Sequence, residues 1–118
     1  MTNYKILITD GLDETGRSIL RASAQVDDRN NISADDLLKA IPDYDGLIVR
    51  GRTKVTAAVM EAASKLNVIG RAGVGVDNID LEAAKKHNFT VVNAPMSTTL
   101  AVAELTVGLM LALAREIP

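Results

Sequence analysis

Five short apolar runs alternate with helix-like stretches along the chain, and this alternation constrains the fold more than any other feature of the sequence. The first run ends at Asp10-Gly11, a turn signal. Short runs that are continuously apolar and separated by helices predict a parallel sheet covered on both faces. The predicted strands are residues 5–9, 24–26, 46–49, 67–70 and 90–92.

The segments between the runs begin at residues that commonly cap helices, namely Asp13, Ser33, Thr56 and Asp80. Right-handed crossovers then leave few ways to connect the strands. We therefore predict an α/β fold of the flavodoxin-like, three-layer αβα type, with a five-stranded parallel sheet in the order 2-1-3-4-5. The length of 118 residues fits one domain, residues 1–118.

The last part of the chain predicts a long apolar helix, residues 98–117. Twelve of the fifteen residues from Leu100 to Ala114 are apolar. The run is shorter than the roughly 20 residues that span a bilayer, so we expect no membrane helix. A helix that is apolar on every side is normally buried on every side, and one small sheet covers only one side.

That helix therefore needs two kinds of cover. We expect Leu105, Leu109 and Ala112 to fold back onto the sheet of the same chain. We expect Val102 and Leu113, on the remaining face, to pair with a second copy of the chain.

Composition narrows the class of protein. A net charge of -2 without a basic run argues against nucleic acid binding, because phosphate backbones require clustered Lys and Arg. The chain has no Cys, which excludes disulfides and thiolate metal sites, and we expect no bound metal. Residues 1–5 lack the pattern of a signal peptide, so the cytoplasm is the expected compartment.

Three loops at the carboxyl ends of predicted strands carry the polar residues suited to an anion site, because ligands of doubly wound sheets bind at that edge. Residues 50–54 contain three cations, residues 71–78 contain two closely spaced glycines, and residues 93–99 end in hydroxyl side chains. Arg binds carboxylate and phosphate with a planar fork, and Gly lets backbone N–H groups approach a ligand. From composition alone, a solvated loop with turn glycines is slightly favoured over a binding site.

The glycines at positions 73 and 75 do not form a dinucleotide motif. The fingerprint G-x-G-x-x-G would require Gly where Asn78 stands, and it belongs after the first strand of its unit instead of a fourth. His87, the only histidine, follows two lysines at a predicted helix end, where a surface role is favoured over catalysis. Asp10 is interpreted as a turn or capping residue.

Several segments together resemble successive motifs of the D-2-hydroxyacid dehydrogenase family, most closely its phosphoglycerate dehydrogenase branch. They are residues 49–56 (VRGRTKVT), 69–80 (IGRAGVGVDNID) and 91–95 (VVNAP). Residues 103–118 resemble the helix that joins the two domains of these enzymes. The resemblance is collinear and covers essentially the whole chain.

The resemblance implies a substrate site. Arg50 and Arg52 match the loop that holds the carboxylate and phosphate of the substrate, and Gly51 stands where some members have Ser. Thr98 stands where many members carry Asn, so a hydroxyl replaces an amide. Gly73, Val74 and Gly75 match the loop that contacts the substrate carboxylate and faces the nicotinamide.

The resemblance also implies what the rest of such an enzyme supplies. The NAD fingerprint and the catalytic Arg, Glu and His of the family would come after Pro118, so we expect this chain alone to have no catalytic residue, no cofactor and no activity. The family reaction is the NAD-dependent oxidation of 3-phospho-D-glycerate to 3-phosphooxypyruvate, in serine biosynthesis. The expected partners are a weakly bound phosphorylated carboxylate, the NAD-binding domain and a second copy. The alternative is a stand-alone flavodoxin-like binding or signalling domain.

Overall fold

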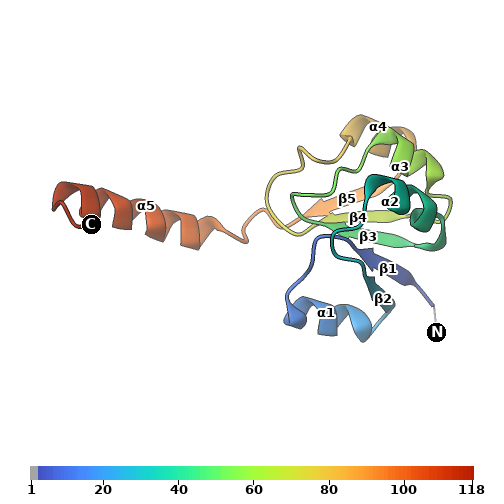
Figure 1. Cartoon of the computed structure of the whole chain (residues 1–118), viewed down its shortest axis with the longest axis horizontal. Coiled ribbons are helices and arrows are strands. Elements are labelled where there is room, and N and C mark those ends of the chain that lie inside the picture. The colour runs from blue at the N-terminus through green and yellow to red at the C-terminus, as the bar shows by residue number, and fades with distance from the viewer. Residues whose placement is uncertain (1–2) are drawn as a thin grey trace.

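The computed structural model describes residues 3–118 and confirms the predicted parallel sheet (Figure 1). The order across the sheet is β2-β1-β3-β4-β5, and every neighbouring pair runs parallel. The carboxyl ends of all five strands therefore meet at one edge. The strands are β1 (Lys5–Ile8), β2 (Gln25–Asp28), β3 (Gly46–Val49), β4 (Val68–Arg71) and β5 (Thr90–Asn93).

Four helices, α1 to α4, begin directly after the four predicted capping residues. The side chains of Asp13, Ser33, Thr56 and Asp80 each accept a hydrogen bond from a backbone N–H in the first turn of the helix that follows. Each cap satisfies a donor that the helix itself leaves unpaired. The helices are α1 (Glu14–Arg21), α2 (Ala34–Ala40), the short 3-10 helix η1 (Ile41–Asp43), α3 (Ala57–Ala62), α4 (Leu81–Lys86) and α5 (Thr99–Ala114).

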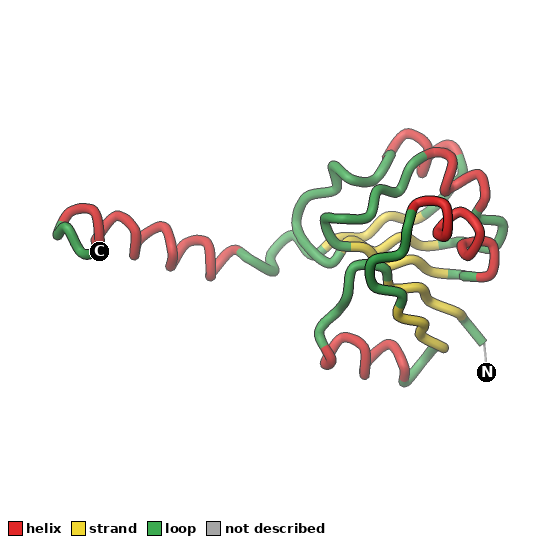
Figure 2. Tube along the Cα trace, in the orientation of Figure 1, coloured by secondary structure: helices red, strands yellow, loops and turns green. Residues whose placement is uncertain are grey.

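The hydrophobic core lies between the sheet and the layer formed by α2, α3 and α4 (Figure 2). Fully burying one aliphatic side chain of this kind contributes roughly 1.5–3 kcal/mol, so this aliphatic layer holds the domain together. Its central side chains are Leu7, Leu47, Val49 and Ile69 from the strands and Leu37, Val59, Met60 and Ala84 from the helices.

Among residues 3–118, the opposite face of the sheet is covered only by α1, which contributes no fully buried residue (Figure 1). Val92 of β5 is 50% exposed on this side. A shallow apolar groove of about 290 Å³ remains between α1 and the sheet. Its apolar lining consists of Leu12, Ile19, Leu20, Ile48, Ala72, Val92 and Ala94.

The expectation that the last helix folds back onto the sheet is wrong. α5 projects away from the rest of the molecule, and Leu105 and Leu109 are 64% and 61% exposed (Figure 1). Apolar residues surround the whole helix, so no single face directs it onto the sheet. Folding back would also cover one side and leave the other exposed. Within residues 3–118, no helix combines the length and apolar character needed to cross a membrane.

Candidate anion-binding site

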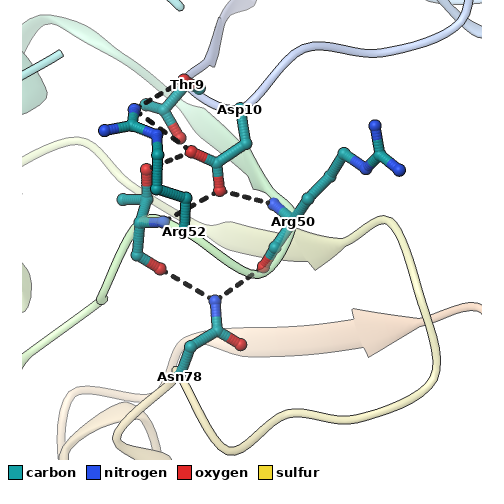
Figure 3. Close-up of polar contacts among 6 residues, drawn as sticks. Thr9, Asp10, Arg50, Arg52 and Asn78 are labelled. Carbon is teal, nitrogen blue, oxygen red and sulfur yellow. Dashed lines mark hydrogen bonds and ion pairs between the residues drawn. The ribbon is translucent and has the colours of Figure 1, made fainter. Parts of the chain in front are cut away.

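The loop after β3, residues 50–54, is held by a carboxylate from the end of β1, because the two strands are neighbours in the sheet. Oδ2 of Asp10 accepts hydrogen bonds from the backbone N–H groups of Arg50 and Thr53, both at 2.9 Å (Figure 3). Oδ1 accepts from the Thr53 hydroxyl and lies 3.3 Å from Nη2 of Arg52. The interpretation of Asp10 as a capping or turn residue is therefore wrong, since its partners lie 40 or more positions later.

The enclosure of Asp10 fixes its charge. Its side chain is only 4% exposed, and this burial raises its pKa. The hydrogen bonds from Thr53 and Arg50 and the charge of Arg52 act in the opposite direction and together prevail, so the pKa lies below its ordinary value of 3.8. The carboxylate is therefore ionised at neutral pH.

A buried amide holds the same loop from its other side. Nδ2 of Asn78 donates hydrogen bonds to the backbone carbonyls of Arg50 (2.7 Å) and Thr53 (2.8 Å), as Figure 3 shows. Asn78 is only 8% exposed. The sequence pattern marked this residue only as the position where a nucleotide motif fails, and its structural role was not predicted.

A cavity of about 500 Å³ opens at this edge of the sheet and brings together three of the predicted site residues. The Arg50 side chain points away from Asp10, whereas the Arg52 guanidinium is turned toward it (Figure 3). The cavity wall also includes two asparagines from the loop after β2, which the sequence did not identify. The full lining is Asp10, Gly11, Asn30, Asn31, Arg50, Gly51 and Arg52.

A third arginine, Arg71 at the end of β4, lies between the two predicted ligand loops. A Cβ atom on Gly73 would overlap Nη1 of Arg71, and one on Gly51 would lie 3.6 Å from Nη2. Nη1 makes one long hydrogen bond, 3.4 Å to the Ala72 carbonyl, and the buried Nε has no partner within residues 3–118. Arg71 therefore keeps donors available between the loops.

The glycine loop itself is tied to the neighbouring strand. The carbonyl of Gly73 accepts from the Ala94 N–H (2.9 Å), and the carbonyl of Val74 accepts from Nδ2 of Asn93 (2.8 Å). These hydrogen bonds hold the backbone carbonyls of the glycine loop against the end of β5 and the residue that follows it. Residues 73–75 do not line the 500 Å³ cavity, and neither does Arg71, which lines the apolar groove beside α1 and lies close to both Gly51 and Gly73.

The remaining predicted residue, Thr98, lies away from the others. It occupies the N-cap position of α5, where its side chain makes no capping hydrogen bond, and it does not line the cavity. His87 follows α4 and stacks on Phe89, with the ring centroids 5.7 Å apart. That contact agrees with a surface role and places the histidine outside the cavity.

The family model for the catalytic domain of D-isomer specific 2-hydroxyacid dehydrogenases matches residues 6–114. The chain belongs to this family. The match begins in β1 and ends at the last residue of α5, so it includes all three loops at the carboxyl edge of the sheet.

Individual relatives of this dehydrogenase family agree. The chain is 54% identical over 114 residues to the D-3-phosphoglycerate dehydrogenase of Methanocaldococcus jannaschii and 50% identical over 115 residues to the human D-3-phosphoglycerate dehydrogenase. Each alignment covers 97% of this chain but only 22% of the relative. The chain thus spans about a fifth of the length of these relatives.

A solved structure supports the fold. The NAD+-bound 3-phosphoglycerate dehydrogenase of Entamoeba histolytica superposes with a TM-score of 0.80 at 33% identity. The superposition covers 94% of this chain and 39% of that protein. Members of the dehydrogenase family therefore contain the observed αβ unit as one part of a larger molecule.

Proposed function

We propose that this chain is the substrate-binding part of a D-3-phosphoglycerate dehydrogenase and that it binds a small phosphorylated carboxylate. The observation that carries the proposal is the cavity at the edge where the strands end, lined by Arg50, Gly51 and Arg52, with the guanidinium of Arg71 close to Gly51 and Gly73. Guanidinium groups bind both carboxylate and phosphate, so a ligand with an anion at each end suits this arrangement. The identity of 50% to 54% with D-3-phosphoglycerate dehydrogenases supports the same ligand.

We infer that the longer protein oxidises 3-phospho-D-glycerate to 3-phosphooxypyruvate with NAD, in the cytoplasm, and that residues outside this chain bind the cofactor and move the proton. The arrangement of residues 73–81 supports this inference, because it differs from that of a dinucleotide-binding loop. The glycine loop does not open a helix: it continues through Asn78, which is buried, and Ile79, which bridges to Val55, before α4 begins at Leu81. A pyrophosphate would need a glycine turn that leads directly into a helix N-terminus.

The role of this chain in the reaction is then to bind and orient the substrate. Arg50 and Arg52 would hold one anionic group in the cavity of about 500 Å³, and Arg71 with the backbone of residues 73–75 would hold the other. The apolar α5 would join this part to the NAD-binding domain and contribute to association with a second copy. A stand-alone flavodoxin-like domain is not favoured, because the match to the dehydrogenases runs through all three loops.

A titration with 3-phospho-D-glycerate, followed by amide chemical shifts, tests the proposal. The open cavity leaves the anion solvated, so each contact contributes little, and we expect a Kd near millimolar or weaker, about -4 kcal/mol. Shifts should cluster at residues 50–53 and 71–75, and D-glycerate, which lacks the phosphate, should give weaker shifts. Shift changes that cluster elsewhere would contradict the proposed site.

A further inference from the structure

Two side chains form hydrogen bonds with the backbone of the first and last residues of the loop 50–53. Asp10 accepts from the N–H groups of Arg50 and Thr53, and Asn78 donates to the carbonyls of the same two residues. Within residues 3–118, the N–H groups of Gly51 and Arg52, in the middle of the loop, have no hydrogen-bond partner. The loop is therefore fixed at both ends, and its central donors remain available.

We propose that Asp10 and Asn78 are positioning residues that hold this loop in its ligand-binding conformation before the ligand arrives. The inference rests on the proposed function, since it concerns the same anion site. Ordering a loop upon binding reduces affinity, and a loop that is already ordered avoids that loss. Neither residue needs to touch the ligand for this role.

Asp10 also orients one of the arginines. Nη2 of Arg52 lies 3.3 Å from Oδ1 of Asp10 and donates to the backbone carbonyl of Thr9 at 3.2 Å. These two contacts occupy a single nitrogen. The other nitrogens of the Arg52 guanidinium remain for the ligand, on a side chain whose direction is already set.

The charge of Asp10 makes the proposal testable by its sign. A carboxylate that lines an anion cavity repels the ligand, so charge alone predicts that removing it strengthens binding. Positioning predicts the opposite, because the loop loses its hydrogen bonds. Asn78 separates the two effects further, since removing its amide changes no charge.

The experiment compares Asp10→Ala, Asp10→Asn and Asn78→Ala with the unchanged 118-residue chain, using 3-phospho-D-glycerate as the probe and amide chemical shifts as the readout. We expect Asp10→Ala and Asn78→Ala to weaken binding by about fivefold or more. Asp10→Asn keeps an acceptor for the backbone and should have a smaller effect. The matched control is Asp77→Asn, which removes an exposed carboxylate of the loop after β4 that makes no hydrogen bond or ion pair within residues 3–118. It should leave affinity unchanged or slightly higher.

A second readout needs no ligand. Relaxation of the amide nitrogens of Gly51 and Arg52 should show greater mobility in Asp10→Ala and Asn78→Ala than in the unchanged chain, at temperatures where the rest of the spectrum is preserved. If Asp10→Ala fails to fold, Asp10→Asn and Asn78→Ala decide the matter. Absence of 3-phospho-D-glycerate binding to the unchanged chain would refute the proposed function, whereas loop mobility would still test the positioning role. The inference would be overturned if residues 50–53 in Asp10→Ala and Asn78→Ala were as rigid as in the unchanged chain. It would also be overturned if removing the Asp10 carboxylate left the affinity unchanged or raised it, as expected for Asp77→Asn.

Discussion

The guanidinium group of Arg71 lies against the backbone of Gly73, in the space where any side chain at position 73 would begin. Gly73 does not adopt the left-handed backbone conformation that favours glycine, since Gly11 is the one glycine with positive φ within residues 3–118. The absence of a side chain, and not an unusual backbone, is therefore what position 73 requires. It admits Arg71 between the two loops of the anion site.

Gly73→Ala should displace Arg71 with little effect on folding. The atoms that a Cβ would meet belong to the far end of a flexible side chain, so the guanidinium moves and the backbone stays. Losing one charged donor should weaken binding of 3-phospho-D-glycerate by about three- to tenfold. Amide shift titrations measure the affinity, and thermal unfolding should remain close to that of the unchanged chain.

The control for this prediction is Gly51→Ala, in the other loop. Its Cβ would make an ordinary contact with Nη2 of Arg71 at 3.6 Å, so Arg71 should keep its place and the loss of affinity should be smaller. Equal affinities of Gly73→Ala and the unchanged chain would show that Arg71 does not contact the ligand.

The topology explains which parts of the site were predictable. Short apolar runs between capped helices indicated the strand order, and that order placed the loops after β3, β4 and β5 at one edge. The same order makes β1 and β3 neighbours, so the strand pattern alone was enough to place Asp10 beside Arg50. Asp10 was instead interpreted locally, because Asp followed by Gly is a common turn signal.

Other features could not be predicted from the sequence. The position of Arg71 depends on a side-chain direction, and strand order says nothing about that. The role of Asn78 depends on the loop after β4 lying beside the loop after β3. The isolated bridge between Val55 and Ile79 holds these two loops together. The direction of α5 was mispredicted because an evenly apolar helix carries no facial pattern that would specify its contacts.

The acid stability of the fold should depend on Asp10. Its pKa in the folded protein lies below the ordinary value of 3.8, so its ionised form stabilises the fold above that pH, and this contribution is lost as the pH falls through the folded pKa. Asp10→Asn cannot titrate and should be destabilised near neutral pH, by about 1–3 kcal/mol for the weakened charged hydrogen bonds. Urea denaturation at a series of pH values measures the difference.

That difference should stay constant from about pH 7 to pH 5 and shrink below about pH 4. It should also persist at high salt, because the side chain of Asp10 is buried and screening acts mainly on exposed charges. A difference that is the same at acidic and neutral pH would mean that the Asp10 charge does not contribute to folding.

NADH should not bind to this chain at micromolar concentration. The glycine loop leads into a buried Asn78 instead of a helix N-terminus, so no cradle for a pyrophosphate is formed by residues 73–78. Titration of NADH with the chain should give no saturable fluorescence enhancement. Saturable NADH binding by the chain alone would contradict the prediction.

Mixing the chain with the remainder of a related dehydrogenase should restore some oxidation of 3-phospho-D-glycerate.

Self-association should depend on α5. Leu113 is 83% exposed, and large apolar side chains are exposed all around the helix. Covering one Leu contributes roughly 1.5–3 kcal/mol, so several exposed leucines on one helix favour a second copy as cover. We expect sedimentation across a concentration series to show reversible association, and Leu113→Glu to shift it toward monomer. Leu81→Glu on α4, at a position that is 48% exposed, is the matched control and should leave the association unchanged. A strict monomer at high concentration, unaffected by Leu113→Glu, would show that α5 does not bring two copies together.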